Sequence, residues 1–464
     1  MDQSLRRPKS SRESSRNLSL VSLPLSRGHY TNGMKTLQND CLQEQIETFS
    51  SLPAEAILKS DVLRLGINFE PEVLSRVSAF KPKDYFIFSF DLVPLAEQSK
   101  DIVFKAPEEI RISGGPYQLK PTVISVRLQP NSPYVVKWND DSGKACLYLE
   151  GVLLGDLDFH GIPAFYGETL STGHRISEIV PVLEWGYLLY ITAFRLCQYW
   201  GEKEECRFCD INENYRQQHK AGRPYTGVKD PEVILEALSK VAEKDDVARA
   251  YTLTGGSVTS ELKGKGEVDF YAQYIEKIEE RFPGRWISKA VVQAFEKEDC
   301  ARLARAGLKI YHPNYEVWDE RLFKLICPGK EATIGRENWI RRVVDSVEVF
   351  GPSKVIPNFV GGVEMSSPHG FTEVDAAVES TREGLSFFME RGVLPRFTTW
   401  CPEPLASLGA QEPPPLEYFS KLLLAWRECF ESSGLPKPEG YGPTGAGRAV
   451  FSVSAFMDVI RDES

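Results

Sequence analysis

The sequence predicts an α/β fold, because two patterns divide the chain. Between about residues 185 and 402, short apolar strands alternate with amphipathic helices at a period of roughly 45 residues. This alternation is typical of parallel βα units, which pack as a barrel or as a doubly wound sheet. Before it, residues 46–180 contain segments rich in Val, Ile and aromatic residues between Pro, Gly and Asn-Asp turns, which predict a β-rich N-terminal domain.

The chain begins with a segment that predicts no packed structure. Residues 1–45 start with many Arg and Ser residues and lack a continuous apolar core, so we expect a disordered tail rather than a secretory signal. An organelle transit peptide is the alternative. The strands expected in the N-terminal domain lie at 84–95, 109–115, 122–128, 132–139 and 144–154.

Six strands are expected in the alternating part of the chain. They lie at 186–194, 249–256, 286–295, 308–316, 354–362 and 393–400. Asp230 and Pro231 predict the cap and first residue of a helix, and further helices are expected at 268–282, 298–307, 337–351 and 373–392. Residues 403–464 then form a C-terminal extension with a Pro-rich linker, a helix over 420–434 and a Gly/Pro-rich segment.

Composition narrows the possible functions. A net charge of -10 argues against general nucleic-acid binding, which needs a surplus of Lys and Arg. No run of 18 apolar residues occurs, so no membrane span is expected. The nine cysteines are an odd number and mostly scattered, which does not predict a disulfide framework and favours a reducing, cytoplasmic compartment.

Three cysteines stand together just after the first strand of the alternating part. Eight residues separate Cys197 from Cys206, and two separate Cys206 from Cys209. A loop at the carboxyl end of a parallel strand is where such folds carry their active sites. Three thiolates leave one position of a metal centre open, which favours chemistry over structure. A structural zinc site with His219 as fourth ligand, and free thiols in a loop, are the alternatives.

The cysteine loop resembles that of the radical S-adenosylmethionine (SAM) enzymes. The resemblance rests on the spacing CX8CX2C with Phe208 before the last cysteine, although the family usually has three residues between the first two cysteines. Further elements in family order follow the ends of later strands. They are Gly255, Gly256 and Ser257, with Ser257 where the family has Glu; Asn314 and Glu316; and Gly361 and Gly362.

The resemblance implies a partial (β/α)6 TIM-type barrel over residues 185–402. It implies a 4Fe-4S cluster on the three cysteines and SAM against the other elements. Reductive cleavage of SAM would give a 5'-deoxyadenosyl radical that abstracts hydrogen from an unknown substrate, as in an oxidoreductase or transferase, with flavodoxin or ferredoxin as reductant. Catalytic residues stay unassigned. Cys401 is a hypothetical hydrogen-atom donor, and Arg336 or Arg341 is a candidate for the SAM carboxylate.

Overall fold

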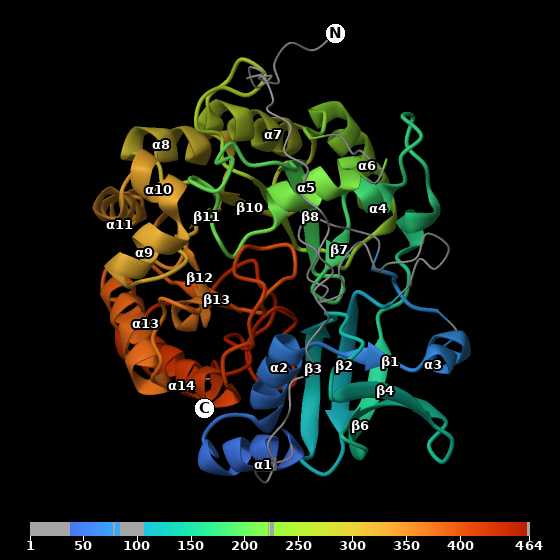
Figure 1. Cartoon of the computed structure of the whole chain (residues 1–464). Coiled ribbons are helices and arrows are strands. Elements are labelled where there is room, and N and C mark those ends of the chain that lie inside the picture. Colours follow the sequence, from blue (N-terminus) through green and yellow to red (C-terminus); the bar gives the residue numbers. More distant parts are fainter. Residues whose placement is uncertain (1–37, 78, 84–105, 221, 223–226, 462–464) are drawn as a thin grey trace, which may run out of the picture.

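The computed structural model describes residues 38–77, 79–83, 106–220, 222 and 227–461 (Figure 1). Residues 38–45, expected in the tail, belong to helix α1 (Gln38–Thr48), in which Leu42 is fully buried. The rest of the expected tail, residues 1–37, and the expected strand 84–95 lie outside the described residues. Helix α2 (Ala54–Leu65) follows α1 and is buried along most of its length.

The first sheet contains six strands in the order β1-β4-β5-β6-β2-β3. All its pairings are antiparallel except that of β1 with β4. The expected strands at 109–115, 122–128, 132–139 and 144–154 are confirmed. The last of these segments divides into a hairpin at Glu150 and Gly151, where φ is positive. The bounds are β1 Asn68–Phe69, β2 Glu109–Gly114, β3 Leu119–Ser125, β4 Tyr134–Asn139, β5 Lys144–Leu149 and β6 Val152–Phe159. Short helices α3 (Pro71–Arg76), η2 (Ala164–Gly167) and α4 (Ile176–Ile179) flank it.

The second half begins with a short strand, β7 (Val182–Leu183), that pairs antiparallel with β8. All six expected strands are confirmed in the alternating part, as are the expected helices, including the Asp230 cap, which accepts a hydrogen bond from the Glu232 amide at 2.8 Å. The strands are β8 Leu188–Phe194, β9 Ala250–Gly255, β10 Ile287–Val292, β11 Ile310–Pro313, β12 Asn358–Gly361 and β13 Arg396–Thr399.

The helices between these strands number more than the sequence predicts. They are α5 Ile211–Lys220, α6 Pro231–Lys244, α7 Glu267–Arg281, α8 Lys297–Ala306, α9 Glu320–Ile326, α10 Pro328–Thr333, α11 Arg336–Asp345, α12 Val347–Phe350 and α13 Val374–Met389. A 3-10 turn, η3, covers Val363–Met365. Helices α5, α9 and α10 were not expected. Figure 1 shows α6, α7, α8, α11 and α13 on the outside of the strands.

The six strands β8 to β13 are parallel and follow one another in sequence order. β8, β9, β10 and β11 share one sheet, and β12 pairs with β13 in another. Two isolated parallel bridges, Tyr311 to Val355 and Glu316 to Phe359, connect the two sheets. The carboxyl ends of all six strands therefore lie along one edge, where side chains of the following loops can converge.

The C-terminal extension joins both halves of the molecule. Its helix α14 (Leu416–Ser433) packs on α13 and α2, and the segment after it lies between β13 and the first sheet (Figure 1). Lys59 of α2 and Asp458 form a fully buried ion pair at 2.9 Å. One continuous hydrophobic core includes Ile112 of β2, Leu253 of β9 and Phe456 of the extension.

No helix in the described part of the chain combines the length and apolar character that a membrane crossing requires.

Candidate functional site

A cavity of about 320 Å³ opens among the carboxyl ends of the parallel strands. All three clustered cysteines line it, together with Phe208, Gly255, Gly256, Ser257, Asn314 and Glu316. The elements that the sequence analysis singled out are thus brought together by the fold, with the exception of Gly361 and Gly362. Further lining residues come from the extension and from the segments flanking β2 and β3, and none of these was predicted.

The cysteine loop is fixed by one buried amide. Asn212, in the first turn of α5, accepts a hydrogen bond from the Cys197 backbone N–H at 2.9 Å. Its side-chain nitrogen donates to the Tyr199 carbonyl at 2.8 Å and to the Cys197 carbonyl at 3.2 Å. Ile211 beside it packs against Cys197 and Cys209. The short helix that follows the third cysteine therefore sets the position of the first.

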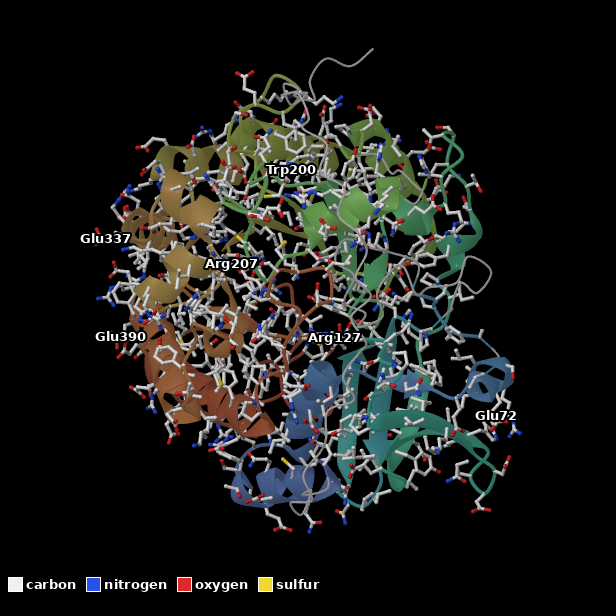
Figure 2. All side chains as sticks on the ribbon, viewed as in Figure 1. Glu72, Arg127, Trp200, Arg207, Glu337 and Glu390 are labelled. Atoms are coloured by element: carbon white, nitrogen blue, oxygen red, sulfur yellow. The ribbon has the colours of Figure 1, made fainter. Side chains whose placement is uncertain are left out.

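The loop is also tied to two distant segments. The Arg207 N–H donates to the Ile326 carbonyl at 2.8 Å, and the Arg207 carbonyl accepts from Leu408 at 3.0 Å. Only the middle of the eight-residue spacer, residues 202–204, is exposed, together with Trp200, which is 47% exposed. Figure 2 labels Trp200 and Arg207 of this loop and Arg127, which follows β3 and lines the other side of the cavity.

The three thiols have different electrostatic surroundings. A hydrogen bond from Cys327 lowers the pKa of Cys206, and so does the positive charge of Lys330. Burial raises this pKa but does not outweigh them. Burial raises the pKa of Cys197 to about 12 and that of Cys209 well above its ordinary value. Cys206 is therefore the thiol most readily present as the thiolate, the form that binds metal.

Cys327, which is scattered from the other cysteines in the sequence, lies against one of the clustered thiols in the fold. It is fully buried and contacts Cys206, 121 positions earlier in the chain, but it does not line the cavity. Its thiol therefore supports Cys206 from behind and does not add a fourth side chain to the cavity wall.

The end of β9 approaches the cysteine loop so closely that only glycine fits. A Cβ on Gly256 would lie 2.0 Å from the Leu196 carbonyl oxygen and 2.4 Å from Cys197 Cα. A Cβ on Gly255 would lie 2.4 Å from the Phe194 carbonyl oxygen. Both glycines are thus required by packing within the chain, and both leave backbone exposed to the cavity. Ser257 is half-buried beside them.

Glu316 forms a buried ion pair that no sequence pattern predicted. Its carboxylate lies 2.5 Å from Lys330 Nζ, and both side chains are at most 9% exposed. Lys330 also donates to the Asn314 carbonyl at 3.0 Å. Burial opposes the charge of Lys330, but Glu316, Cys206 and Cys327 together raise its pKa. Glu316 adopts φ 81, a strained conformation for a residue with a side chain, which often marks functional sites.

Gly361 and Gly362 face away from the cavity. A Cβ on Gly361 would meet Leu422 of α14 at 2.9 Å, and one on Gly362 would meet Pro414 at 2.8 Å. The C-terminal extension thus occupies the space next to the end of β12. The predicted contact of these glycines with a cofactor has no support in the lining of the cavity.

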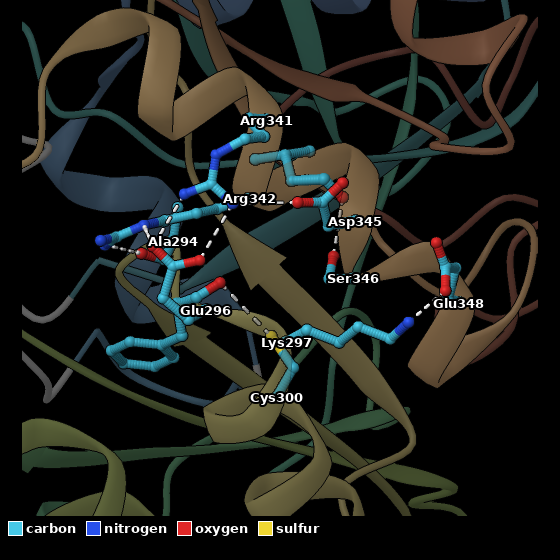
Figure 3. A network of polar contacts seen from close by, with 11 residues as sticks. Ala294, Glu296, Lys297, Cys300, Arg341, Arg342, Asp345, Ser346 and Glu348 are labelled. Atoms are coloured by element: carbon cyan, nitrogen blue, oxygen red, sulfur yellow. Dashed lines mark hydrogen bonds and ion pairs between the residues drawn. The ribbon is translucent and has the colours of Figure 1, made fainter.

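Neither candidate arginine reaches the cavity. Arg341 is half-exposed and pairs with Glu296 at 2.8 Å and with Asp345 at 3.0 Å, in a surface network that Figure 3 shows. Arg336 donates to the Trp318 carbonyl at 2.9 Å and stacks on the Trp318 ring. The cation beside the cysteines is Lys330. Since α10 was not expected, no sequence signal pointed to it.

The zinc alternative is not favoured by the position of its fourth ligand. His219 is exposed in the last turn of α5 and contacts the ring of Tyr215. A zinc site needs all its ligands about 2 Å from one ion, and among the described residues no group of three or more His, Cys, Asp or Glu side chains is arranged around such a point.

Two further groups line the cavity. Cys401 is buried after β13, and its thiol donates to the Arg64 carbonyl at 3.5 Å. Glu267, at the start of α7, accepts hydrogen bonds from the amides of Val258 at 2.9 Å and Gln293 at 3.1 Å. Burial raises the pKa of Glu267 to about 7. A carboxyl group with this pKa can hold or release a proton near neutral pH.

Fold and site together define an α/β protein whose parallel strands end around a cavity lined by the three clustered thiols and by Cys401, an arrangement typical of enzymes. No family model matches the chain. Among curated proteins, a stretch of 155 residues is 27% identical to the bacteriochlorophyllide c C-7(1)-hydroxylase of Chlorobaculum limnaeum. This stretch is 32% of the chain, which spans about a third (34%) of the length of that relative.

Solved structures with partial similarity include three enzymes or maturases. Methylornithine synthase covers 53% of this chain, with 69% of its own length, 11% identity and a TM-score of 0.37. The hydrogenase maturase HydG covers 55%, with 52% of its own length, 13% identity and a TM-score of 0.39. Coproporphyrinogen III oxidase from Escherichia coli, described as a radical SAM enzyme, covers 53%, with 52% of its own length, 15% identity and a TM-score of 0.31.

One of these proteins, coproporphyrinogen III oxidase, carries the name of the family that the cysteine loop resembles.

Proposed function

We propose that the protein is a radical SAM enzyme that holds a 4Fe-4S cluster on Cys197, Cys206 and Cys209. The observation that carries the proposal is that these three thiols line the same cavity as Gly256 and Glu316, two of the further elements in family order. When bound, the cluster supplies the electron that splits SAM and so yields the 5'-deoxyadenosyl radical, which takes a hydrogen atom from the substrate.

The residues of the cavity fit these cofactors. Thiolates are the protein ligands of such clusters, and the hydrogen bond from Cys327 and the charge of Lys330 favour the thiolate of Cys206. Cys327 stays behind the cavity wall, and Cys401 lines the cavity from the segment after β13 rather than from the cysteine loop. The three thiols of the loop would therefore hold the cluster and leave a position for SAM. Such a cluster would need no single-ion geometry from the three thiolates.

The chain also offers groups for SAM itself. The exposed backbone at Gly255 and Gly256 suits the amino group of its methionine part, and Ser257 adds a hydroxyl group beside it. Glu316 suits the ribose hydroxyl groups, and Lys330, held beside it at 2.5 Å, adds a positive charge for the carboxylate. Asn314 fixes the neighbouring strand by accepting from the Asn358 N–H at 3.2 Å.

The fold and partners follow from the same proposal. The sequential parallel order of β8 to β13 suits a partial (β/α)6 barrel over residues 185–402, with the N-terminal sheet and the C-terminal extension as further domains. A flavodoxin or ferredoxin would deliver the electron. The exposed ring of Trp200, with Arg216 4.4 Å above it, lies in the cysteine loop and is a candidate contact for such a donor.

The test is an anaerobic reconstitution with iron and sulfide. We expect a brown protein with broad absorption at about 400 nm. After reduction with dithionite, this protein should form 5'-deoxyadenosine from SAM. Cys197→Ala, Cys206→Ala and Cys209→Ala should each lose the absorption and the cleavage. Cys429→Ala, a buried cysteine of α14 outside the cavity, is the matched control.

Two results would contradict the proposal. One is a colourless protein that binds one zinc ion per chain, and the other is an iron-loaded protein that leaves SAM intact. Cys327→Ala discriminates within the proposal. It should retain the cluster if Cys327 only donates a hydrogen bond to Cys206, and should lose it if Cys327 is itself a ligand.

A further inference from the structure

The cavity continues from the cysteines toward the amino ends of the strands and ends in a set of polar side chains. We call this set the polar floor; it consists of Glu184, Lys289, His312, Arg396 and Tyr441, all of which line the cavity. Lys289 lies opposite Thr252 in the sheet, three residues before Gly255 on β9. At about 3.3 Å per residue, the polar floor lies about 10 Å from the glycines proposed to contact SAM.

The polar floor holds two cations. Lys289 is 2% exposed; its Nζ donates to the Gly440 carbonyl at 2.5 Å and lies 4.2 Å from the Tyr441 ring. The Arg396 guanidinium lies 5.7 Å from the Tyr441 ring and 5.3 Å from the Phe451 ring. Within the described part of the chain it makes no hydrogen bond or ion pair. Its donors are therefore available to a ligand.

One carboxylate partly balances these cations. Glu184 is 5% exposed, and its Oε2 atom has no hydrogen-bond partner among the described residues. Burial raises the pKa of Glu184 and lowers that of Lys289, whereas each charge favours the charged form of the other. His312 is neutral, because burial and the two cations lower its pKa. The polar floor thus places two basic side chains, Lys289 and Arg396, opposite one carboxyl group, Glu184.

The backbone that positions Glu184 is strained. Glu184 and Trp185 both adopt φ 54, in the left-handed region that residues with side chains rarely adopt. The Glu109 carboxylate accepts hydrogen bonds from the two amides, at 2.8 Å and 2.9 Å. A strained turn that another carboxylate stabilises, and that directs into a cavity a carboxylate with one unbonded oxygen, is the kind of strain found at functional sites.

Other buried atoms of the cavity wall lack partners as well. Besides Glu184 Oε2, such atoms of lining residues include Asn358 Oδ1, Arg396 Nε and Thr399 Oγ1, none of which bonds a described residue. Buried polar atoms in folded proteins are nearly always hydrogen-bonded. Two of these atoms accept, one donates and one can do either. The ligand that satisfies them therefore carries both acceptors and donors.

We propose that the polar floor binds the carboxylate of a small substrate that also carries an amino or hydroxyl group. Arg396 and Lys289 hold the carboxylate, and Glu184 and Asn358 accept hydrogen bonds from the amino or hydroxyl group. Two basic side chains opposite one carboxyl group suit a single negative charge better than a phosphate dianion. The claim that this molecule is the substrate of the reaction rests on the proposed function. The claim that it binds in the cavity does not.

The test is binding by calorimetry at pH 7.5, with the full-length chain as purified and its iron content measured on the same sample. The probes are L-alanine, L-serine, L-tyrosine, L-lactate and glycolate, the amides of the three amino acids, and inorganic phosphate. We expect at least one of the carboxylates to bind and its amide to bind at least tenfold more weakly. Arg396→Met should weaken binding at least tenfold, and Arg396→Lys should weaken it less.

The controls separate binding from folding. Arg341→Gln, in the surface network of Figure 3, should bind as the wild type does, and thermal unfolding without ligand shows whether Arg396→Met folds. The proposal is overturned if none of the carboxylates binds, if phosphate or the amides bind more tightly, or if Arg396→Met and Lys289→Met bind like the wild type.

The two proposals can fail separately. Binding that depends on Arg396 in a protein that neither holds iron nor cleaves SAM would leave the ligand site standing and contradict the proposed function. SAM cleavage by a protein that binds none of the carboxylates would leave the proposed function standing and contradict the ligand site.

Discussion

Gly256→Ala tests whether the end of β9 positions the cysteine loop. A Cβ at this residue would lie 2.0 Å from the Leu196 carbonyl oxygen, 2.4 Å from Cys197 Cα and 2.6 Å from Cys197 Cβ. Such contacts are essentially never shorter than 3.0 Å, so the loop has to move by about 1 Å. Functional sites tolerate displacements of only about 0.5 Å. We therefore expect most of the iron to be lost and SAM cleavage to fall about 100-fold.

The effect on stability should be small by comparison. Overpacking of this kind costs about 1–3 kcal/mol. Unfolding entropy of about 2.1 cal/mol/K per residue makes this about 1–3 °C in Tm for a chain of this length. Iron content and 5'-deoxyadenosine formation are measured beside Tm, with Gly161→Ala as control, because a Cβ on Gly161 meets no atom within 4 Å. If Gly256→Ala keeps the iron content and the SAM cleavage of the wild type, the close approach between the end of β9 and the cysteine loop is refuted.

Three other variants test the supports of the site. Lys330→Met leaves Glu316 buried without its cation, so the free energy of unfolding should fall by about 3–5 kcal/mol in a denaturant titration; a loss below about 1 kcal/mol would contradict the buried pair. Asn212→Ala leaves the Cys197 N–H without an acceptor and should cost about 1–3 kcal/mol, and Asn212→Asp, which keeps the acceptor, should cost less. Glu267, with its pKa raised from 4.5 to about 7, holds a proton in the folded state that the unfolded chain releases. Its contribution to stability is therefore fully present below pH 4.5 and lost as the pH rises through 7. Glu267→Gln should remove about 3 kcal/mol of this pH dependence, seen as a smaller fall in Tm between pH 5 and pH 8, and an unchanged fall would contradict the assignment.

The βα elements could be predicted because each is specified locally. Apolar runs bounded by Gly and Pro mark the strands, and the Asp230-Pro231 cap marks the start of α6. The position of the cysteines, Gly256 and Glu316 at one edge follows from the same pattern, since parallel strands bring their carboxyl ends together. The order of these residues along the chain was therefore enough to predict much of the cavity wall at the cysteine end.

The supports of the site could not be predicted, because they depend on contacts between distant segments. Cys327 and Lys330 lie more than 100 positions after Cys206. Cys327 stands between α9 and α10 and Lys330 lies on α10, and both helices are too short to give a clear periodic pattern. Gly361 and Gly362 were expected at the cavity but do not line it. Their order along the chain fitted the family pattern, but α14 covers them, and nothing in the sequence specifies where a separate C-terminal helix packs.

The C-terminal extension has a consequence for specificity. The segment around Val453 accepts a hydrogen bond from Thr399 at the end of β13, and Ser452 accepts one from Ser125 of β3. Tyr441 and Phe451 of the same segment flank Arg396. The cysteine end of the cavity is thus built from loops of the βα units, whereas the polar floor needs the extension and the turn at Glu184, which Glu109 of the first sheet holds. Residues that the proposed radical chemistry requires and residues that would select the substrate therefore come from different parts of the chain. A change in the extension or the first sheet can alter the substrate without displacing the cysteines.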